Sequence, residues 1–141
     1  MPGKMTQEQF NEFLDAKPGW IILTSVSSTG YPHSVPLGYF RDGEKIYCGV
    51  RDNTQKILNI ERNPKVSLLV ESGSTMADIK GAMVQGDAVV HREPEKVLAL
   101  MRAGATARGV AETELPTAPN PGSAFIEITP VNQISWDYGA V

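Results

Sequence analysis

Hydrophobic positions near the start of the chain follow a helical spacing. Phe10, Phe13 and Leu14 fall on one face of a helix. Thr6 and Gln9 fit a capping box, in which each side chain accepts a hydrogen bond from the other residue's backbone N–H. The Pro-Gly pair at 18–19 would end the helix. These signals predict an N-terminal helix within residues 1–19.

From residue 20 onward, short runs of branched apolar residues alternate with turn residues, and such runs predict β-strands. The Asp42-Gly43 pair predicts a hairpin, while Gly81 and Gly86 are available for β-bulges. The strand-like runs cover residues 20–26, 32–40, 45–50, 65–71, 79–91, 124–129 and 133–136. About six strands with two or three short helices are typical of a closed or nearly closed β-barrel.

A second helix is expected between the strands. Asn53 or Thr54 can cap it, and the Asn-Pro pair at 63–64 would end it. Ile57, Leu58 and Ile60 are expected to face inward.

A third helix begins near Pro94, a residue that suits the first helical turn. Val97, Leu98 and Met101 form its predicted apolar stripe. Residues 104–122 are rich in Ala, Gly, Thr and Pro, and they predict a long, weakly structured loop. Loops of this length often act as lids or contact partners.

Length and composition indicate one folded domain over residues 1–141. A chain of 141 residues and 15.3 kDa is near the common domain size. Hydrophobic residues make up 41% of it, which is ordinary for a globular protein. Together with the strand-like runs, this predicts one mainly β domain with short helices. A barrel of this size leaves little internal room for a cofactor.

Charge and cysteine content exclude several classes of function. The net charge of −3 argues against nonspecific binding to nucleic acid or to an acidic membrane. With Cys48 as the only cysteine, neither an internal disulfide framework nor a thiolate zinc site is expected. The N-terminus has no signal-peptide pattern and no apolar run approaches the ~20 residues of a membrane span. We expect a soluble, cytoplasmic protein.

The common catalytic motifs are missing from the sequence. It contains no Gly-x-Ser-x-Gly elbow, no phosphate-binding loop and no dinucleotide fingerprint. Cys48 lies in an apolar strand and is interpreted as a buried structural thiol. His33 and His91 lie near strand ends and are interpreted as surface or hydrogen-bonded residues.

The most informative block covers residues 50–59, where a strand ends and a helix begins. The helix N–H groups, the Thr54 hydroxyl and the charges of Arg51 and Lys56 could converge on a phosphate. The same residues fit a capped helix with two solvated cations. The block by itself leaves both interpretations open.

Around this block the chain resembles the pyridoxamine 5'-phosphate oxidase-like flavin-binding split-barrel family over residues 20–137. The likeness rests on the order and spacing of short motifs, which are Gly30-Tyr31-Pro32, Ser34-Val35-Pro36-Leu37, Asp42-Gly43, the strand 46–50, Thr54-Gln55-Lys56, Asn63-Pro64, the strand 79–86 and Ile134-Ser135-Trp136-Asp137. The resemblance implies a six-stranded Greek-key split β-barrel. It also implies a homodimer with cofactor sites at its interface.

The same resemblance implies which residues hold the cofactor, with FMN as the first choice. Thr54 and Lys56, with Arg51 beside them, would bind its phosphate. The isoalloxazine ring would lie along Ser34, Val35, Pro36 and Leu37 and along Gly49 and Val50. Lys80 and Gly81 match a position that contacts the flavin, although the family's usual Gln is absent there. Trp136 would cover the ring from the partner subunit or pack in the core near the C-terminus.

Departures from the family pattern exclude pyridoxamine 5'-phosphate as the expected substrate. The Arg near Ser34 and the terminal Arg-Leu-x-Pro stretch of true pyridoxamine-phosphate oxidases are absent. The chain is more similar to short members, some of which use the deazaflavin coenzyme F-420. The acidic tail of F-420 needs a basic groove, which Arg51, Lys56, Arg62, Lys65 and Lys80 could form, or these could be scattered surface cations.

We therefore expect an oxidoreductase that transfers hydride between FMN and a small organic substrate. No catalytic residue of the protein is assigned, because the cofactor carries the reaction. The alternatives are an F-420-dependent reductase and a non-catalytic flavin- or haem-binding carrier or sensor. The identity of the substrate and the role of the 104–122 loop are left open.

Overall fold

A computed structural model describes residues 3–140 of the chain. Met1, Pro2 and Val141, which the predicted 1–141 domain includes, lie outside the described residues. The elements follow in the order α1 (Gln7–Asp15), β1 (Ile21–Val26), β2 (Pro32–Leu37), β3 (Phe40–Asp42), β4 (Lys45–Arg51), α2 (Gln55–Arg62), β5 (Lys65–Ser72), β6 (Lys80–His91), α3 (Pro94–Ala107), the 3-10 turn η1 (Glu112–Glu114), β7 (Ser123–Asp137) and the 3-10 turn η2 (Tyr138–Ala140).

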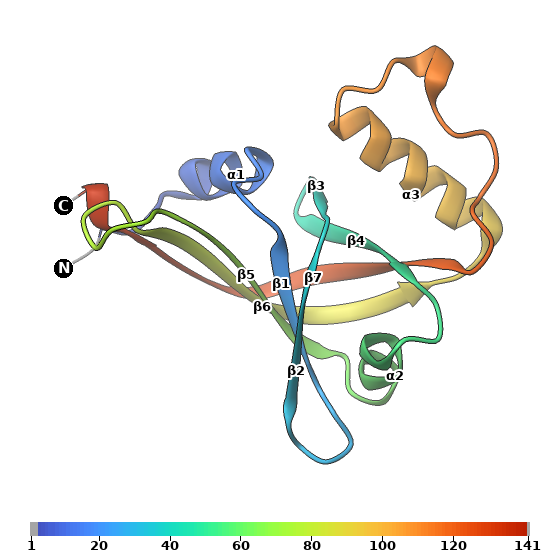
Figure 1. Cartoon of the computed structure of the whole chain (residues 1–141), viewed down its shortest axis with the longest axis horizontal. Helices are drawn as coiled ribbons and strands as arrows, with labels where there is room; N and C mark the ends of the chain where they lie inside the picture. Colours follow the sequence, from blue (N-terminus) through green and yellow to red (C-terminus); the bar gives the residue numbers. More distant parts are fainter. Residues whose placement is uncertain (1–2, 141) are drawn as a thin grey trace.

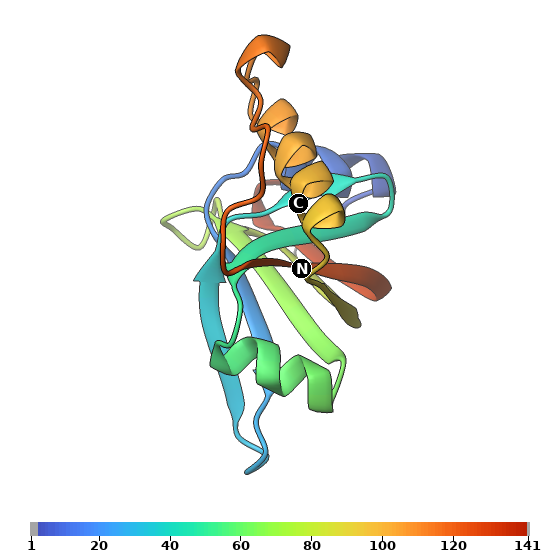
Figure 2. The ribbon, with the colours of Figure 1, turned by 90° about the vertical axis from the view of Figure 1, so that its right-hand side faces the viewer.

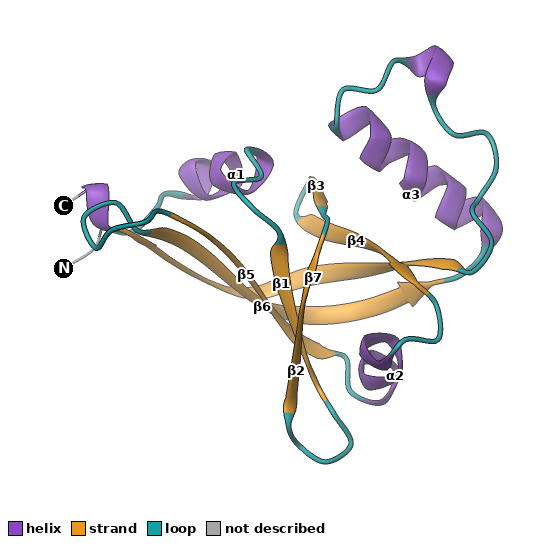
Figure 3. Ribbon diagram, in the orientation of Figure 1, coloured by secondary structure: helices purple, strands orange, loops and turns teal. Residues whose placement is uncertain are grey.

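The strands form one curled antiparallel sheet in the order β2-β1-β5-β6-β7-β4-β3 (Figures 1 and 3). The predicted mainly β split barrel with short helices is confirmed, but the sheet has seven strands and not six. The run 32–40 is divided into β2 and β3, because Gly38 and Tyr39 leave the strand conformation. The runs 124–129 and 133–136 form a single strand, β7.

A β-bulge lets the two longest strands, β6 and β7, remain paired along their length. The register shifts between Gln85 and Gly86, as the glycine pattern predicted for Gly86. A Cβ on Gly86 would lie 2.5 Å from the Thr129 carbonyl oxygen, so only glycine fits this approach. Gly81 lies in regular register opposite Trp136 and forms no bulge.

Helix α1 forms where the sequence predicted a helix and packs against β3 and β6. Its capping box is present, with the Thr6 hydroxyl accepting from the Gln9 N–H at 3.1 Å and the Gln9 side chain accepting from the Thr6 N–H at 2.9 Å. Phe10, Phe13 and Leu14 are buried in the main core with the inward residues of the sheet. The helical spacing therefore identified the buried face correctly.

Helix α2 packs into the same core near the opposite end of β1 (Figure 2). Ile57 and Ile60 are buried, whereas Leu58, which was expected to face inward, is 52% exposed. One residue turns the helix by about 100°, so Leu58 cannot share the face of its neighbour Ile57. The buried Asn59 occupies the inner face instead and donates to the Ser25 hydroxyl at 3.0 Å.

Helix α3 covers the outer side of the sheet near β3, β4 and β7. Val97 and Leu100 pack with Phe40, Tyr47 and Phe125 in a second hydrophobic cluster. The predicted stripe is partly wrong, because Leu98 and Met101 are only half-buried and Leu100 is the fully packed residue.

The expected loop 104–122 begins later than predicted. Residues 104–107 form the last turn of α3, and Glu112–Glu114 form a 3-10 turn. Gly104 lies in the last turn of the helix. A Cβ there would lie 3.1 Å from the Phe40 ring, so the missing side chain lets α3 pack closely on Phe40. The Arg102 guanidinium donates to the Pro116 carbonyl at 2.8 Å and ties the remaining loop to α3.

Residues 3–140 contain neither a membrane-spanning helix nor a cluster of metal-ligating side chains. None of their helices has both the length and the apolar character needed to cross a membrane. Nor do three or more His, Cys, Asp or Glu side chains gather there in an arrangement that could hold a metal ion.

Candidate functional site

The turn between β4 and α2 leaves a helix N-terminus without a side-chain cap. Thr54 precedes the first helical residue, but its hydroxyl donates back to the Arg51 carbonyl at 3.1 Å. Asn53 has a left-handed backbone with φ of 59°, which turns the chain sharply into the helix. The first N–H groups of α2 are therefore available to an anion beside Arg51 and Thr54.

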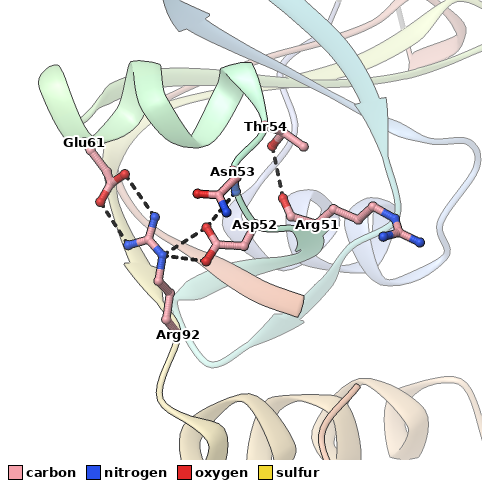
Figure 4. A network of polar contacts seen from close by, with 6 residues as sticks. All are labelled: Arg51, Asp52, Asn53, Thr54, Glu61 and Arg92. Carbon is pink, nitrogen blue, oxygen red and sulfur yellow. Dashed lines mark hydrogen bonds and ion pairs between the residues drawn. The ribbon is translucent and has the colours of Figure 1, made fainter. Parts of the chain in front are cut away.

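Arg92 holds Asp52 of this turn and Glu61, near the end of α2, on the side of the turn opposite to the Arg51 side chain (Figure 4). Its Nε contacts both Asp52 carboxylate oxygens, at 2.8 and 3.0 Å, and its two terminal nitrogens donate to Glu61 at 2.9 and 3.0 Å. These hydrogen bonds hold the pKa of Asp52 below its usual value and raise the pKa of Arg92. The Arg51 side chain points away from this network, so the turn has a neutralised side and a cationic side.

Lys56 adds a second positive charge in the first turn of α2. The side chain is half-buried and, within residues 3–140, has no hydrogen bond or ion pair. Burial raises the pKa of the Cys48 thiol to about 12, and the charge of Lys56 opposes that rise. Cys48 is a fully buried thiol, as the sequence indicated.

Strand β2 presents alternating surfaces along the predicted ring-binding segment. Ser34 and Pro36 are exposed, whereas Val35 and Leu37 pack against the core. Because β2 lies at an edge of the sheet, part of its backbone N–H and C=O groups have no strand partner. Such groups fit the polar edge of a flavin ring.

Strand β4 continues this outward surface next to β2, which it contacts. Gly49 is exposed and Arg51 follows on the same side, while Val50 packs against the core. A Cβ on Gly49 would lie 3.2 Å from the Phe125 ring, so glycine keeps this part of the surface flat. The segment therefore suits the planar ring of a molecule whose phosphate group reaches Arg51.

A buried polar network fixes the position of α2 against β1. Gln55 donates to Asn59 at 2.8 Å, and Asn59 donates to Ser25, the cross-strand partner of His33. The Nδ1 atom of His33 is buried and has no hydrogen-bond partner within the described residues. The sequence predicted that His33 is a surface or hydrogen-bonded residue. For its Nδ1 atom this prediction is wrong.

The remaining predicted site residues lie at the far end of β6 and β7, near the chain termini (Figure 1). Trp136 lies on Gly81, its cross-strand partner, and Lys80 pairs with Asp137 at 3.7 Å. The 12 residues of β6 lie between Lys80 and Arg92, a strand length of about 40 Å at about 3.3 Å per residue. One chain therefore assembles two separate groups of predicted site residues, one around β2, β4 and α2 and one around Gly81.

An apolar row crosses the outer face of the sheet between these two groups. Its members are directly paired across five strands, and none belongs to either hydrophobic cluster: Pro36, Ile22, Leu69, Met83 and Ile134. The helices pack elsewhere, since α1 and α2 contribute to the main core and α3 to the second cluster. This row depends on strand register, which sequence patterns did not provide.

A cavity of about 630 Å³ opens beside Gly49, under α3. Gly49 is the one predicted site residue among its described lining residues. Sequence reasoning missed the others, because they come from four separated parts of the chain: Lys17, Gly19, Trp20, Gly38, Tyr39, Phe40, Leu100, Met101, Gly104, Ala105, Arg108, Pro116, Asn120 and Phe125.

Comparison with known proteins gives one family and several similar structures. A family profile described as pyridoxamine 5'-phosphate oxidase matches residues 6–137. A conserved hypothetical protein from Mycobacterium tuberculosis is 21% identical with a TM-score of 0.82, over 95% of this chain and 86% of that one. No curated protein sequence matches significantly.

Two other similar structures are described by a cofactor. An F-420 reductase is 21% identical with a TM-score of 0.69, over 92% of this chain and 98% of that one. An FAD-binding protein from Mesorhizobium loti is 18% identical with a TM-score of 0.72, over 96% of both chains. At these identities the likeness shows the shared fold.

Proposed function

The chain belongs to the pyridoxamine 5'-phosphate oxidase family, and we propose that it is a flavin-dependent oxidoreductase that binds FMN. The observation that carries the proposal is the β4–α2 turn. The uncapped helix N-terminus, the Thr54 hydroxyl and the Arg51 side chain lie away from the network in which Arg92 holds Asp52 and Glu61, and Lys56 adds a positive charge in the first turn of the helix. A phosphate monoester dianion is the ligand that this arrangement favours.

The rest of the proposed site follows from the surface that leads away from the phosphate. The ring would lie on the outward side of Ser34, Pro36 and Gly49, with the backbone of Val35, Leu37 and Val50 facing its polar edge. FMN supplies hydride transfer when bound, so the chain needs no acid or base of its own. The residues of this chain anchor the phosphate, orient the ring and exclude water from one of its faces.

FMN is favoured over F-420 because three of the five cations proposed for a basic groove already have partners. Of the five proposed for a basic groove, Arg62 donates to the Val26 carbonyl, Lys65 lies 4.0 Å from Asp87 and Lys80 lies 3.7 Å from Asp137. Arg51 and Lys56 have no hydrogen bond or ion pair through their side chains within residues 3–140. Two available cations match the single phosphate of FMN better than the long acidic tail of F-420. F-420 is the second candidate because this chain shares its fold with an F-420 reductase.

We further propose that the working unit is a homodimer. The apolar row defined above has no helix packed on it, with Pro36 and Ile134 exposed and its other members half-buried. Trp136, Gly81 and Lys80 lie too far from the turn to share its ligand. A second copy seated on the row would cover apolar surface and bring its own Trp136 toward the first copy's ring.

The substrate is proposed to be a small organic molecule other than pyridoxamine 5'-phosphate. Strand β2 has no Arg near Ser34. The chain therefore lacks the basic group that true pyridoxamine-phosphate oxidases use at this position.

Cofactor titration tests the proposal. We expect purified protein to quench FMN fluorescence with a dissociation constant in the micromolar range or below, and to cycle the bound flavin between reduced and oxidised forms. Tight binding of F-420 alone would replace FMN by the deazaflavin. Bound flavin that no reductant or acceptor turns over would indicate a carrier. If neither cofactor binds at micromolar concentration, the proposal is wrong.

A further inference from the structure

The cavity beside Gly49 lies between α3 and the outward side of the sheet. Its floor includes Phe40 and Phe125, whose rings meet edge to face with centroids 6.4 Å apart. Leu100 and Met101 of α3, which belong to the same hydrophobic cluster as these rings, also line the cavity. These side chains give the interior an apolar and mainly aromatic surface.

Glycines keep the walls of the cavity flat. Gly38 lies under the edge of the Trp20 ring, since a Cβ there would be 3.8 Å from it, and Trp20 itself is 69% exposed at the cavity. Gly49 and Gly104 lie against the Phe125 and Phe40 rings, where a Cβ would come within 3.2 and 3.1 Å of ring atoms. A cavity lined by aromatic rings favours planar aromatic molecules.

Two positive charges lie on the same cavity. The Arg108 guanidinium folds back over Gly104, 3.5 Å from where a Cβ would be, and Lys17 lies 6.0 Å from the centroid of the Tyr39 ring. Burial lowers the pKa of Lys17, the charge of Arg108 lowers it further, and Asp15 opposes both.

These two cations lack a carboxylate partner at the cavity. Asp15 is already held by Arg41 through contacts of 2.6 and 3.0 Å. Among the described residues that line the cavity, none is Asp or Glu. An anionic ligand would relieve the repulsion between Lys17 and Arg108 and would gain charge-assisted hydrogen bonds.

We propose that this cavity is the substrate site and that its substrate is a planar aromatic carboxylate, bound by Lys17 and Arg108. The inference rests on the proposed function, because Gly49 belongs both to the cavity and to the strand along which the flavin ring is proposed to lie. A volume of about 630 Å³ is in the range of small-molecule sites and accommodates a ligand of two or three fused rings. The carboxylate lies toward α3 and the ring system lies between Trp20, Phe40 and Phe125.

Calorimetric titration with 2-naphthoate and its neutral analogue 2-naphthamide tests this assignment on FMN-loaded and FMN-free protein. We expect 2-naphthoate to bind both forms at least about tenfold more tightly than 2-naphthamide, since charge-assisted hydrogen bonds are the stronger ones. Arg108→Gln should raise the dissociation constant of 2-naphthoate about tenfold and leave that of 2-naphthamide unchanged. Lys96→Gln, an exposed cation of the same helix, is the matched control and should change neither.

Four outcomes would overturn the assignment. The two probes could bind equally well, or neither could bind. Arg108→Gln and Lys96→Gln could have the same effect on 2-naphthoate. Finally, 2-naphthoate could bind only the FMN-free protein, which would make the cavity part of the cofactor site. Failure of the proposed function is distinguishable, because wild-type protein would then not bind FMN while the FMN-free titration would still report on the cavity.

Discussion

The indole of Trp136 lies directly on the backbone of Gly81, its partner across β6 and β7. A Cβ on Gly81 would come within 2.3 Å of two indole carbons, a distance that no packed pair can adopt. Glycine at position 81 thus sets the orientation of Trp136 on the outer face of the sheet. This is the residue that we propose to cover the flavin ring of the partner subunit.

Gly81→Ala is expected to displace Trp136. Overpacking at this contact should lower the free energy of unfolding by about 1–2 kcal/mol, because the indole can move partly toward solvent. Urea unfolding measures the stability, and the emission maximum of Trp136 in a Trp20→Phe background reports the displacement. Gly30→Ala is not a suitable control because Gly30 has a positive φ, so Ser72→Ala serves that purpose. An unchanged emission maximum in Gly81→Ala would show that the indole does not rest on Gly81.

Lys56→Ala is expected to weaken FMN binding by about 1.5–3 kcal/mol, or roughly 10- to 150-fold, if Lys56 makes a charge-assisted bond to the phosphate. Lys56→Arg should retain most of the affinity. The control is Lys65→Ala, whose side chain is 81% exposed and lies near Asp87. Fluorescence titration with FMN measures all three variants. Equal affinities for Lys56→Ala and wild type would show that Lys56 is a solvated cation that does not bind the phosphate.

Arg92→Ala is expected to weaken FMN binding without any contact between Arg92 and the cofactor. Removing Arg92 leaves the carboxylates of Asp52, in the β4–α2 turn, and of Glu61, near the end of α2, without this partner, and their charge would repel a dianion at the proposed phosphate site. Adding Asp52→Asn to Arg92→Ala should restore part of the affinity. If the double variant binds FMN no better than Arg92→Ala, the role assigned to Arg92 is incorrect.

The stability of the fold is expected to depend on Glu127 at acidic pH. Burial opposes ionisation of Glu127, but hydrogen bonds from Lys45 at 2.9 Å and from His91 at 3.2 Å outweigh it, and the net result holds the pKa of Glu127 below its ordinary value of 4.5. A carboxylate with a lowered folded-state pKa stabilises the fold above 4.5, and this contribution is lost as the pH falls through the folded pKa.

The measurement is the urea midpoint of wild type and Glu127→Gln at about pH 5.5 and about pH 3.5. Wild type should lose more stability over this interval than Glu127→Gln, which has no carboxylate to protonate at that position. Part of the loss will remain in the variant, because Asp52 and Asp78 also have lowered pKa values. Identical losses in both proteins would contradict the prediction.

Local signals explain why much of the fold was predictable. The capping box at Thr6 and Gln9, the hairpin at Gly43 and the bulge at Gly86 each depend on residues close in sequence or on one backbone conformation. The boundary errors have local causes too. Gly104 was interpreted as the start of a loop, although the structure uses its missing side chain to pack α3 on Phe40.

The parts of the site that depend on distant pairing could not be predicted. Arg92 reaches Asp52 across 40 positions of sequence, and only the alignment of β6 with the end of β4 brings them together. The apolar row around Leu69 and Met83 appears only when the register of five strands is known. The strand-to-helix block singled out Thr54 and Lys56, and the resemblance to a family assigned them to a phosphate. The cavity residues Lys17 and Arg108 carry no sequence motif.

Mixed dimers test most directly the central claim that each flavin site is built from two copies of this chain. One copy carries Lys56→Ala and the other carries Trp136→Ala, each with a different affinity tag, so that the mixed species can be purified. If Lys56 and Trp136 of different copies meet at one site, the mixed dimer has one intact site and one doubly altered site. We predict wild-type FMN affinity at half the wild-type stoichiometry. Weakened binding at every site, with no wild-type site, would contradict it.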